Sequence, residues 1–205
     1  MKSGNTMFHY PIPYHPAVQK RTPPFVWGNG LFSDAELDKI NAYAETLPAK
    51  QVRVGEQTLT YKPQVNRSIV RHLPPNGETL WIYQKISLMV SLLNSQHYKY
   101  DITGFDEPLY HVTYLADDQG HYDWHIDKNG DNQPTRKLSI TFQMTDPAAY
   151  DGGNLEINAY GSIDACPRDR GKLILFPSYE LHRVTPVTRG TRSALVAWSV
   201  GPPFR

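Results

Sequence analysis

The sequence lacks several features that define common protein classes. It has one cysteine, Cys166, among 205 residues, so no internal disulfide can form and a reducing compartment is the simpler expectation. It has no run of the roughly 18 apolar residues that a membrane helix needs, because its most apolar stretch, Leu80–Leu93, contains Gln84, Lys85 and two serines. Its first ten residues lack the basic segment and apolar run of a secretion signal. We therefore expect a cytoplasmic protein that does not cross a membrane.

The sequence also lacks an excess of charge of either sign. Lys and Arg total 21 and Asp and Glu total 20, which gives a net charge of +1 at pH 7. Proteins that depend on electrostatic attraction to nucleic acids or anionic membranes carry a clear basic surplus, so the balance argues against both kinds of partner. A specific nucleic-acid substrate stays open.

Proline and aromatic residues, by contrast, are plentiful. The 17 prolines and the 12% of aromatic residues favour a β protein rich in loops over a helical bundle. Five prolines fall within residues 1–24 without an apolar period, which predicts an extended N-terminal arm. The remaining length fits one domain over residues 25–205, with helical support in 25–100 and the core in 101–205.

Two helices are predicted in the supporting half. Ser33, with Glu36 three residues later, is a capping box and predicts a helix that runs to about Leu47 before Pro48. A second helix is predicted from about Glu78 to Ser95, where apolar residues recur at helical spacing. We expect the apolar stripes of both helices to face the core.

From Pro108 onward the pattern changes to short apolar or alternating runs separated by Gly, Asp, Asn and Pro. Such runs predict antiparallel strands, with Asp151–Gly153 and Thr188–Gly190 as hairpin connections. The chain is therefore expected to be α+β and mainly β, with a jelly-roll core, or double-stranded β-helix, behind its N-terminal helices. The predicted strands are Leu109–Leu115, His121–Ile126, Lys137–Met144, Asn154–Ile157, Lys172–Phe176, His182–Val187 and Arg192–Val200.

A candidate metal site lies among the eight histidines. His125 stands two residues before Asp127, and residues i and i+2 of a strand point to the same face, so both can reach one ion. The alternative is a surface turn with a solvated Asp127. His182, at the start of a later predicted strand, offers a third ligand. Two His and one carboxylate form the facial triad of non-haem Fe(II) enzymes, which leaves three coordination positions open.

Arg192 follows His182 by ten residues and begins the last predicted strand. Because the strand continues with small and apolar residues, the guanidinium is expected either to be exposed at the strand's start or to be paired inside the barrel. A bidentate anion, such as the distal carboxylate of 2-oxoglutarate, would satisfy a buried guanidinium.

These residues resemble a known family, the Fe(II)- and 2-oxoglutarate-dependent dioxygenases of the prolyl-4-hydroxylase-like superfamily, and are most similar to its PKHD-type hydroxylases. The resemblance covers roughly residues 105–200, whereas the N-terminal hundred residues match only in general shape. The matching segments, in order, are His125–Asp127, Arg136–Ser139, Tyr150–Leu155, Gly171–Ser178 and His182–Arg192.

The resemblance implies roles for individual residues. His125, Asp127 and His182 would bind the iron, and Arg192 would hold the distal carboxylate of 2-oxoglutarate. Prolyl hydroxylases usually have Lys at that position, so the Arg points to the PKHD-type branch. Further contacts to the cosubstrate are expected from Tyr114, with Tyr110 as the alternative, and from Ser139.

The resemblance also implies the reaction. We expect a hydroxylase that uses Fe(II), 2-oxoglutarate and O₂, with ascorbate as reductant, and that releases succinate and CO₂. A peptide or protein residue is the expected substrate by analogy, and a free amino acid or small metabolite is the alternative. Two other readings stay open: a binding module that kept the metal ligands but lost turnover, and a facial-triad oxygenase that does not use 2-oxoglutarate.

Overall fold

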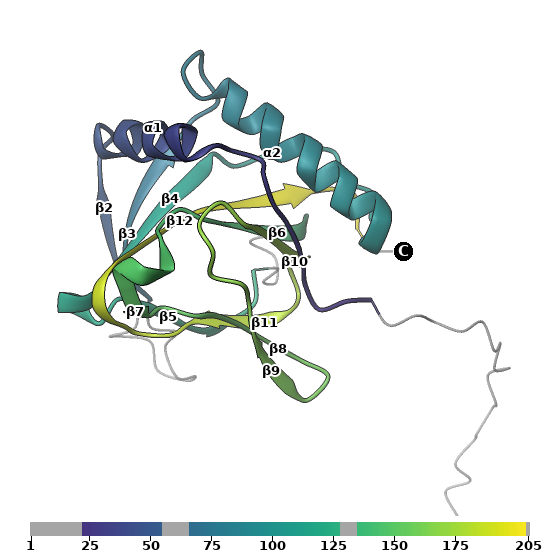
Figure 1. Cartoon of the computed structure of the whole chain (residues 1–205). Helices are drawn as coiled ribbons and strands as arrows, with labels where there is room; N and C mark the ends of the chain where they lie inside the picture. Colours follow the sequence, from purple (N-terminus) through teal and green to yellow (C-terminus); the bar gives the residue numbers. More distant parts are fainter. Residues whose placement is uncertain (1–21, 55–65, 128–134, 204–205) are drawn as a thin grey trace, which may run out of the picture.

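The computed structural model describes residues 22–54, 66–127 and 135–203. Most of the predicted Pro-rich arm therefore lies outside the described residues. The described chain forms two long helices and a strongly curled antiparallel sheet, and both helices lie on one side of that sheet (Figure 1).

The helices confirm the sequence signals. Helix α1, Asp34–Glu45, begins with the predicted capping box: the Glu36 amide donates to Ser33 Oγ, and the Ser33 amide donates to the Glu36 carboxylate. Helix α2, Leu80–Leu93, lies within its predicted range and continues into a π-helical turn, Asn94–Tyr98. Both helices bury their apolar stripes, as expected.

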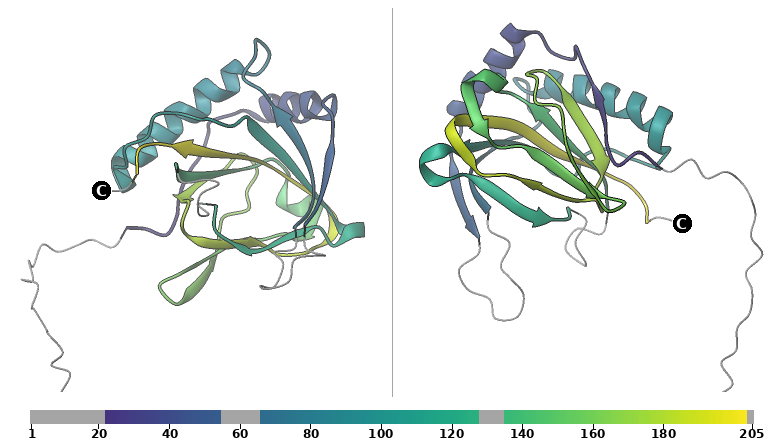
Figure 2. Two further views of the ribbon diagram at one scale, coloured as in Figure 1. Left: turned by 180° about the vertical axis from the view of Figure 1, so that it is seen from behind. Right: turned by 60° about the horizontal axis from the view of Figure 1, so that its bottom comes forward.

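One curled sheet contains nearly all the strands, in the order β1-β10-β6-β12-β4-β3-β5-β11-β8-β9, with β2 paired to β3 and β7 paired to β12. The end containing β5, β11, β8 and β9 folds under the part that carries the helices (Figure 2). The strands are β1 Val26–Gly28, β2 Lys50–Val54, β3 Asn66–Leu73, β4 Leu109–Leu115, β5 His121–His125, β6 Arg136–Gln143, β7 Tyr150–Gly152, β8 Leu155–Ala159, β9 Ser162–Ala165, β10 Leu173–Pro177, β11 Leu181–Val184 and β12 Val187–Val200.

Alternation along the strands builds two hydrophobic layers. On β6, Leu138, Ile140 and Phe142 pack toward α1 and α2 in the larger core cluster. The opposite face of the sheet contributes to a second cluster inside the curl, which includes Tyr114 and Phe176. Because successive side chains of a strand point to opposite faces, the residues of β6 between those three point into the curl.

The structure corrects one predicted connection. Thr188–Gly190 is not a hairpin, because β12 is continuous from Val187 to Val200. Its first residues pair with β7, and its later residues pair with β4 and β6. Gly190 permits the change of partner: its φ is +71°, and a Cβ atom there would lie 2.1 Å from the Ala149 carbonyl oxygen. The prediction of a turn was wrong because Gly190 lets β12 pass close to the Ala149 backbone without reversing the chain.

Other differences are smaller. The predicted connection Asp151–Gly153 begins within β7, and the predicted strand His182–Val187 ends at Val184 before Pro186. Strand β9 was not predicted because all four of its residues are exposed and give no apolar alternation. The segment predicted as helical support also supplies β1, β2 and β3.

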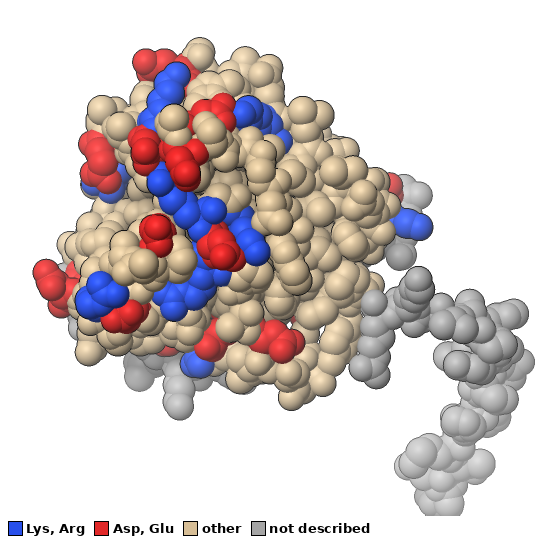
Figure 3. Space-filling view, viewed as in Figure 1, with Lys and Arg blue, Asp and Glu red and all other residues tan. Residues whose placement is uncertain are grey.

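The surface is unevenly charged. Figure 3 shows Lys, Arg, Asp and Glu gathered over α1 and the loops below it, whereas the part of this face formed by α2 carries few of them. Within α2, Lys85 is the only charged residue, and Leu88 and Leu92 are exposed.

Candidate metal and cosubstrate site

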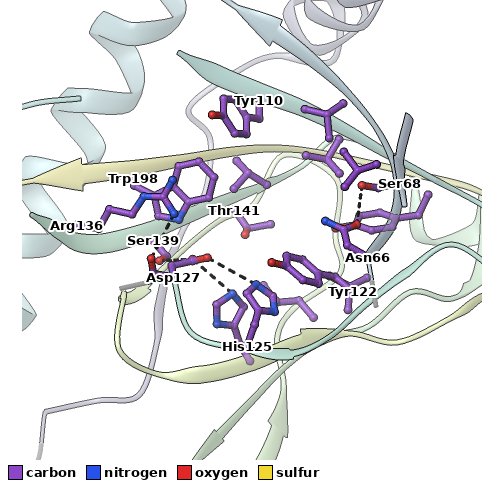
Figure 4. Close-up of a pocket in the computed structure, with 18 of the residues that line it drawn as sticks. Asn66, Ser68, Tyr110, Tyr122, His125, Asp127, Arg136, Ser139, Thr141 and Trp198 are labelled. Carbon is purple, nitrogen blue, oxygen red and sulfur yellow. Dashed lines mark hydrogen bonds and ion pairs between the residues drawn. The ribbon is translucent and has the colours of Figure 1, made fainter. Parts of the chain in front are cut away.

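The three predicted metal ligands meet in the described structure. His125 ends β5, Asp127 follows two residues later, and His182 lies opposite His125 in the pairing of β5 with β11. Their ligand atoms all lie within 4.8 Å of one another, and all three side chains are buried. The distances to the Asp127 carboxylate are 3.6 Å from His125 Nε2 and 3.5 Å from His182 Nε2 (Figure 4).

Both imidazoles are oriented by backbone carbonyls. Nδ1 of His125 lies 2.7 Å from the Asp123 oxygen, and Nδ1 of His182 lies 2.9 Å from the Glu180 oxygen. Since a carbonyl only accepts, each Nδ1 carries a proton, and Nε2 is the ring nitrogen that faces Asp127. Burial, with the neighbouring His182, lowers the pKa of His125, which favours the neutral form that binds metals.

The carboxylate of Asp127 is ionised in this setting. Burial alone would raise its pKa, but the two histidines and the hydrogen bond from Ser139 outweigh burial and hold the pKa below its ordinary value. Two imidazole lone pairs and one carboxylate, converging from one side, fit the facial triad of a non-haem iron site. The chemistry of these donors therefore fits a divalent metal such as Fe(II).

A cavity of about 350 Å³ opens beside the triad. Tyr114 and Tyr110 both line it, but at different ends: Tyr114 lies opposite Arg192 in the pairing of β4 with β12, whereas the Tyr110 hydroxyl donates to Glu107 at 3.0 Å. Burial raises the pKa of Tyr114 to about 12, so its hydroxyl keeps its proton and can act as a donor.

Arg192 is buried inside the sheet, with 1% of its surface exposed, so of the two expectations for this residue the structure shows the interior one. Its Nη2 donates to Gln143 Oε1 at 3.1 Å, its guanidinium carbon lies 5.4 Å from the Tyr114 ring centre, and its Nε has no hydrogen-bond partner among the described residues. Arg192 does not itself line the cavity and lies behind Tyr114. A buried cation with one neutral partner fits an anion such as a carboxylate.

Ser139 lines the cavity and lies four residues before Gln143, the partner of Arg192, on β6. Its Oγ donates to Asp127 Oδ2 at 2.6 Å and lies 3.1 Å from Ser178 Oγ. In the described structure the Ser139 hydroxyl therefore contacts a predicted metal ligand, Asp127. The residue of β6 that contacts Arg192 is Gln143.

Sequence reasoning missed several residues of the site. Thr141 lines the cavity, and Gln143 contacts Arg192. Both have the same strand parity as Ser139, so the alternation of the predicted strand Lys137–Met144 could have revealed them. His121 shares the parity of His125 but does not line the cavity.

A second missed group is an ion pair beside Asp127. The Arg136 guanidinium lies 3.6 Å above the Trp198 ring and forms two hydrogen bonds to Glu107, of 2.8 and 2.7 Å. Arg136 and Trp198 both line the cavity (Figure 4). No local signal in the sequence links Glu107 to Arg136, because they lie 29 residues apart with β4 and β5 between them.

Comparisons with known proteins agree with the site. Residues 110–200 match the family model of the 2OG-Fe(II) oxygenase superfamily. The chain is 41% identical over 81 residues to a PKHD-type hydroxylase of Hyphomonas neptunium, a match that covers 38% of this chain and 36% of that protein. It is 42% identical over 84 residues to a PKHD-type hydroxylase of Teredinibacter turnerae, covering 38% and 37%. The chain thus matches less than two fifths of these relatives' length.

Solved structures show the same fold. A prolyl-4-hydroxylase from Pseudomonas putida superposes with a TM-score of 0.65 at 17% identity, covering 87% of this chain and 93% of that chain. A prolyl hydroxylase from Trichoplax adhaerens, solved with a hypoxia inducible factor peptide fragment, gives 0.65 at 18% identity, covering 88% and 84%. These findings confirm the predicted jelly roll. The sequence matches confirm the predicted resemblance to the 2OG-Fe(II) oxygenases, with PKHD-type hydroxylases among the similar proteins.

Within the three described ranges, no helix has the length and apolar character needed to span a membrane.

Proposed function

We propose that this chain, which matches the 2OG-Fe(II) oxygenase superfamily over residues 110–200, is an Fe(II)- and 2-oxoglutarate-dependent hydroxylase. One observation carries the proposal: a buried triad of His125, Asp127 and His182 shares a barrel interior with the buried guanidinium of Arg192. The triad fits a divalent metal, and the guanidinium fits the far carboxylate of a dicarboxylic acid.

In this proposal the triad holds Fe(II), which supplies the oxidation by O₂ that hydroxylates a C–H bond while 2-oxoglutarate becomes succinate and CO₂. The chain's own residues bind and orient. His125 and His182 present Nε2 because their Nδ1 protons are held by carbonyls, and the buried walls keep water from the reacting atoms. Ascorbate is the proposed reductant.

Arg192 and Tyr114 are the proposed contacts to the cosubstrate. They are directly opposed on neighbouring strands, and Gln143 fixes one edge of the guanidinium while leaving Nε without a partner among the described residues. Tyr110 is less suited, because Glu107 already accepts its proton. Since Arg192 lies behind Tyr114, we expect the tyrosine ring to shift when the carboxylate binds.

We further propose a peptide or protein side chain as the substrate. Two similar structures are prolyl hydroxylases, and one of them was solved with a peptide fragment. In this chain the cavity extends past Asp127 to an aromatic wall of Tyr110 and Trp198, whose rings meet edge to face at 5.2 Å. Such a wall offers an apolar surface to an aliphatic side chain or ring.

We also propose that residues 25–205 act as one domain. The helices α1 and α2 bury their apolar stripes against β6, β10 and β12 in one shared core, so removing the helices would expose the outer face of the barrel.

The test is turnover of the cosubstrate. The protein is incubated with Fe(II), ascorbate, 2-oxoglutarate and O₂, with and without a panel of proline-containing peptides, and succinate is measured. We expect slow succinate formation without a peptide, faster formation with an accepted peptide, and none for His182→Ala. Wild-type protein that forms no more succinate than His182→Ala under any of these conditions would contradict the proposed activity.

A further inference from the structure

We infer that Ser139 is a positioning residue that holds the carboxylate of Asp127 in its metal-binding orientation. The resemblance predicts a different role for Ser139, a contact to the cosubstrate. The inference rests on the proposed function for the identity of the metal, but its geometry comes from the described residues alone.

Asp127 needs such support because it lies beyond the end of its strand. Strand β5 ends at His125, so the sheet ladder does not fix Asp127. Two other hydrogen bonds hold its backbone: its amide donates to the Ser178 oxygen at 3.0 Å, and Arg136 Nη1 donates to its carbonyl oxygen at 3.3 Å. These bonds leave the rotation of the carboxylate about its terminal torsion undetermined, and that torsion has broad preferences of its own.

Ser139 supplies a direct restraint on this torsion, beside the Trp198 side chain, which also acts on the carboxylate. Its Oγ lies 2.6 Å from Asp127 Oδ2, a short distance typical of a hydroxyl that donates to an ionised carboxylate. A hydroxyl has one hydrogen, so donation from Ser139 Oγ to Asp127 at 2.6 Å competes with donation to Ser178 Oγ at 3.1 Å, and the shorter contact to the carboxylate is favoured. Both serines are buried, and Ser178 is itself fixed by its amide, which donates to the Lys137 oxygen. Ser178 Oγ is thus a second, more distant acceptor for the hydroxyl that contacts the metal ligand.

The position of Ser139 on β6 separates this role from cosubstrate binding. Ser139 and Gln143 share the inward face of the strand but lie four residues apart, about 13 Å at ~3.3 Å per residue. Gln143 contacts Arg192, the proposed carboxylate anchor, whereas Ser139 contacts Asp127. The hydroxyl of Ser139 thus donates its hydrogen to Asp127, beside the proposed metal.

The two roles predict opposite effects on two affinities. Hydrogen-bond partners of metal ligands typically change metal affinity by about 10–100-fold when removed. A positioning role therefore predicts that Ser139→Ala weakens metal binding by about this factor and leaves the affinity of the metal-saturated protein for 2-oxoglutarate unchanged. A cosubstrate contact predicts unchanged metal affinity and weaker binding of 2-oxoglutarate.

The experiment uses Mn(II), which does not react with 2-oxoglutarate and O₂, as the probe. Metal-free full-length protein is titrated with Mn(II) while free Mn(II) is followed by electron paramagnetic resonance. The Mn(II)-saturated protein is then titrated with 2-oxoglutarate by calorimetry. The variants are Ser139→Ala, Ser139→Thr, which keeps a hydroxyl, and Ser178→Ala, which removes only the competing acceptor.

Ser199→Ala is the matched control. Ser199 is also a buried serine of the sheet, but its Oγ has no hydrogen-bond partner among the described residues. We expect weaker Mn(II) binding in Ser139→Ala, no loss in Ser178→Ala, recovery in Ser139→Thr and wild-type affinity in Ser199→Ala. Urea unfolding of each metal-free variant verifies that the fold is intact.

Two outcomes overturn the inference in distinguishable ways. Wild-type affinity for Mn(II) in Ser139→Ala, with or without weaker binding of 2-oxoglutarate, removes the positioning role while the proposed function stands. A wild-type protein that binds no Mn(II) removes the proposed function and this inference with it.

Discussion

Replacing Arg192 by methionine removes a buried guanidinium while keeping an unbranched side chain of similar length. If Arg192 anchors the distal carboxylate of 2-oxoglutarate, the substitution removes two charge-assisted hydrogen bonds. Each is worth about 1.5–3 kcal/mol, so the loss is about 3–6 kcal/mol. At about 1.4 kcal/mol per tenfold, the dissociation constant should rise by roughly 10²–10⁴-fold.

The assay is calorimetric titration of Mn(II)-saturated protein with 2-oxoglutarate, which requires no turnover. Arg192→Lys should bind with intermediate affinity, because an ammonium keeps the charge but not the planar fork of donors. Arg189→Met is the matched control: Arg189 lies three residues earlier on β12, but it is exposed and pairs with Asp151, so its loss should leave the affinity unchanged.

Stability has to be measured beside affinity, because Arg192→Met also leaves Gln143 Oε1 without its donor. A buried acceptor left without a partner costs about 1–3 kcal/mol, and the urea midpoint should fall accordingly. A folded Arg192→Met variant that binds 2-oxoglutarate as tightly as the wild type would refute the assignment of the anchor.

Three further predictions concern the fold. Ser33→Ala removes the side-chain cap of α1 and should lower the free energy of unfolding by about 1 kcal/mol in urea; an unchanged midpoint would contradict the capping box. Gly190→Ala places a Cβ atom 2.1 Å from the Ala149 oxygen at a residue with positive φ. The substitution should lower the free energy of unfolding by at least ~1–3 kcal/mol or prevent folding. A urea unfolding curve like that of the wild type would count against the close approach of β7 and β12. Burial and nearby Arg71 lower the pKa of His111 to about 4, below the ~6.5 of an unfolded chain. The contribution of neutral His111 to the free energy of unfolding is therefore complete above about pH 6.5 and is lost as the pH falls toward 4. His111→Gln should flatten this dependence in urea unfolding of the metal-free protein, and an identical pH dependence in variant and wild type would argue against it.

Local patterns in the sequence account for much of the fold. The capping box at Ser33 placed the start of α1, and alternating or apolar runs placed strands such as β4 within a residue or two. Features without a local signal were missed. Strand β9 has no buried face, and β12 changes its pairing partner within one continuous strand, which depends on the distant β7 and not on the sequence around Gly190.

In the candidate site, too, some features follow from a local sequence pattern and others do not. The spacing of His125 and Asp127, two residues apart, could be read directly from the sequence, and the structure brings both to His182 although Asp127 lies just beyond the end of β5. The hydrogen-bond partner of Ser139 could not be predicted from the sequence, because its hydroxyl contacts Asp127, which lies beyond the end of another strand. The pairing of Arg136 with Glu107 likewise depends on two segments that only the folded chain brings together.

The central claim is that the triad binds Fe(II) and that the Fe(II)-loaded protein binds 2-oxoglutarate. Anaerobic titration of the metal-free protein with Fe(II) and then 2-oxoglutarate tests it most directly, with the weak visible charge-transfer absorbance of a chelated iron complex as the readout. We expect a band that requires both additions in the wild type and is absent in His182→Ala. A wild-type protein that gives no band, or a His182→Ala variant that gives the same band, would contradict it.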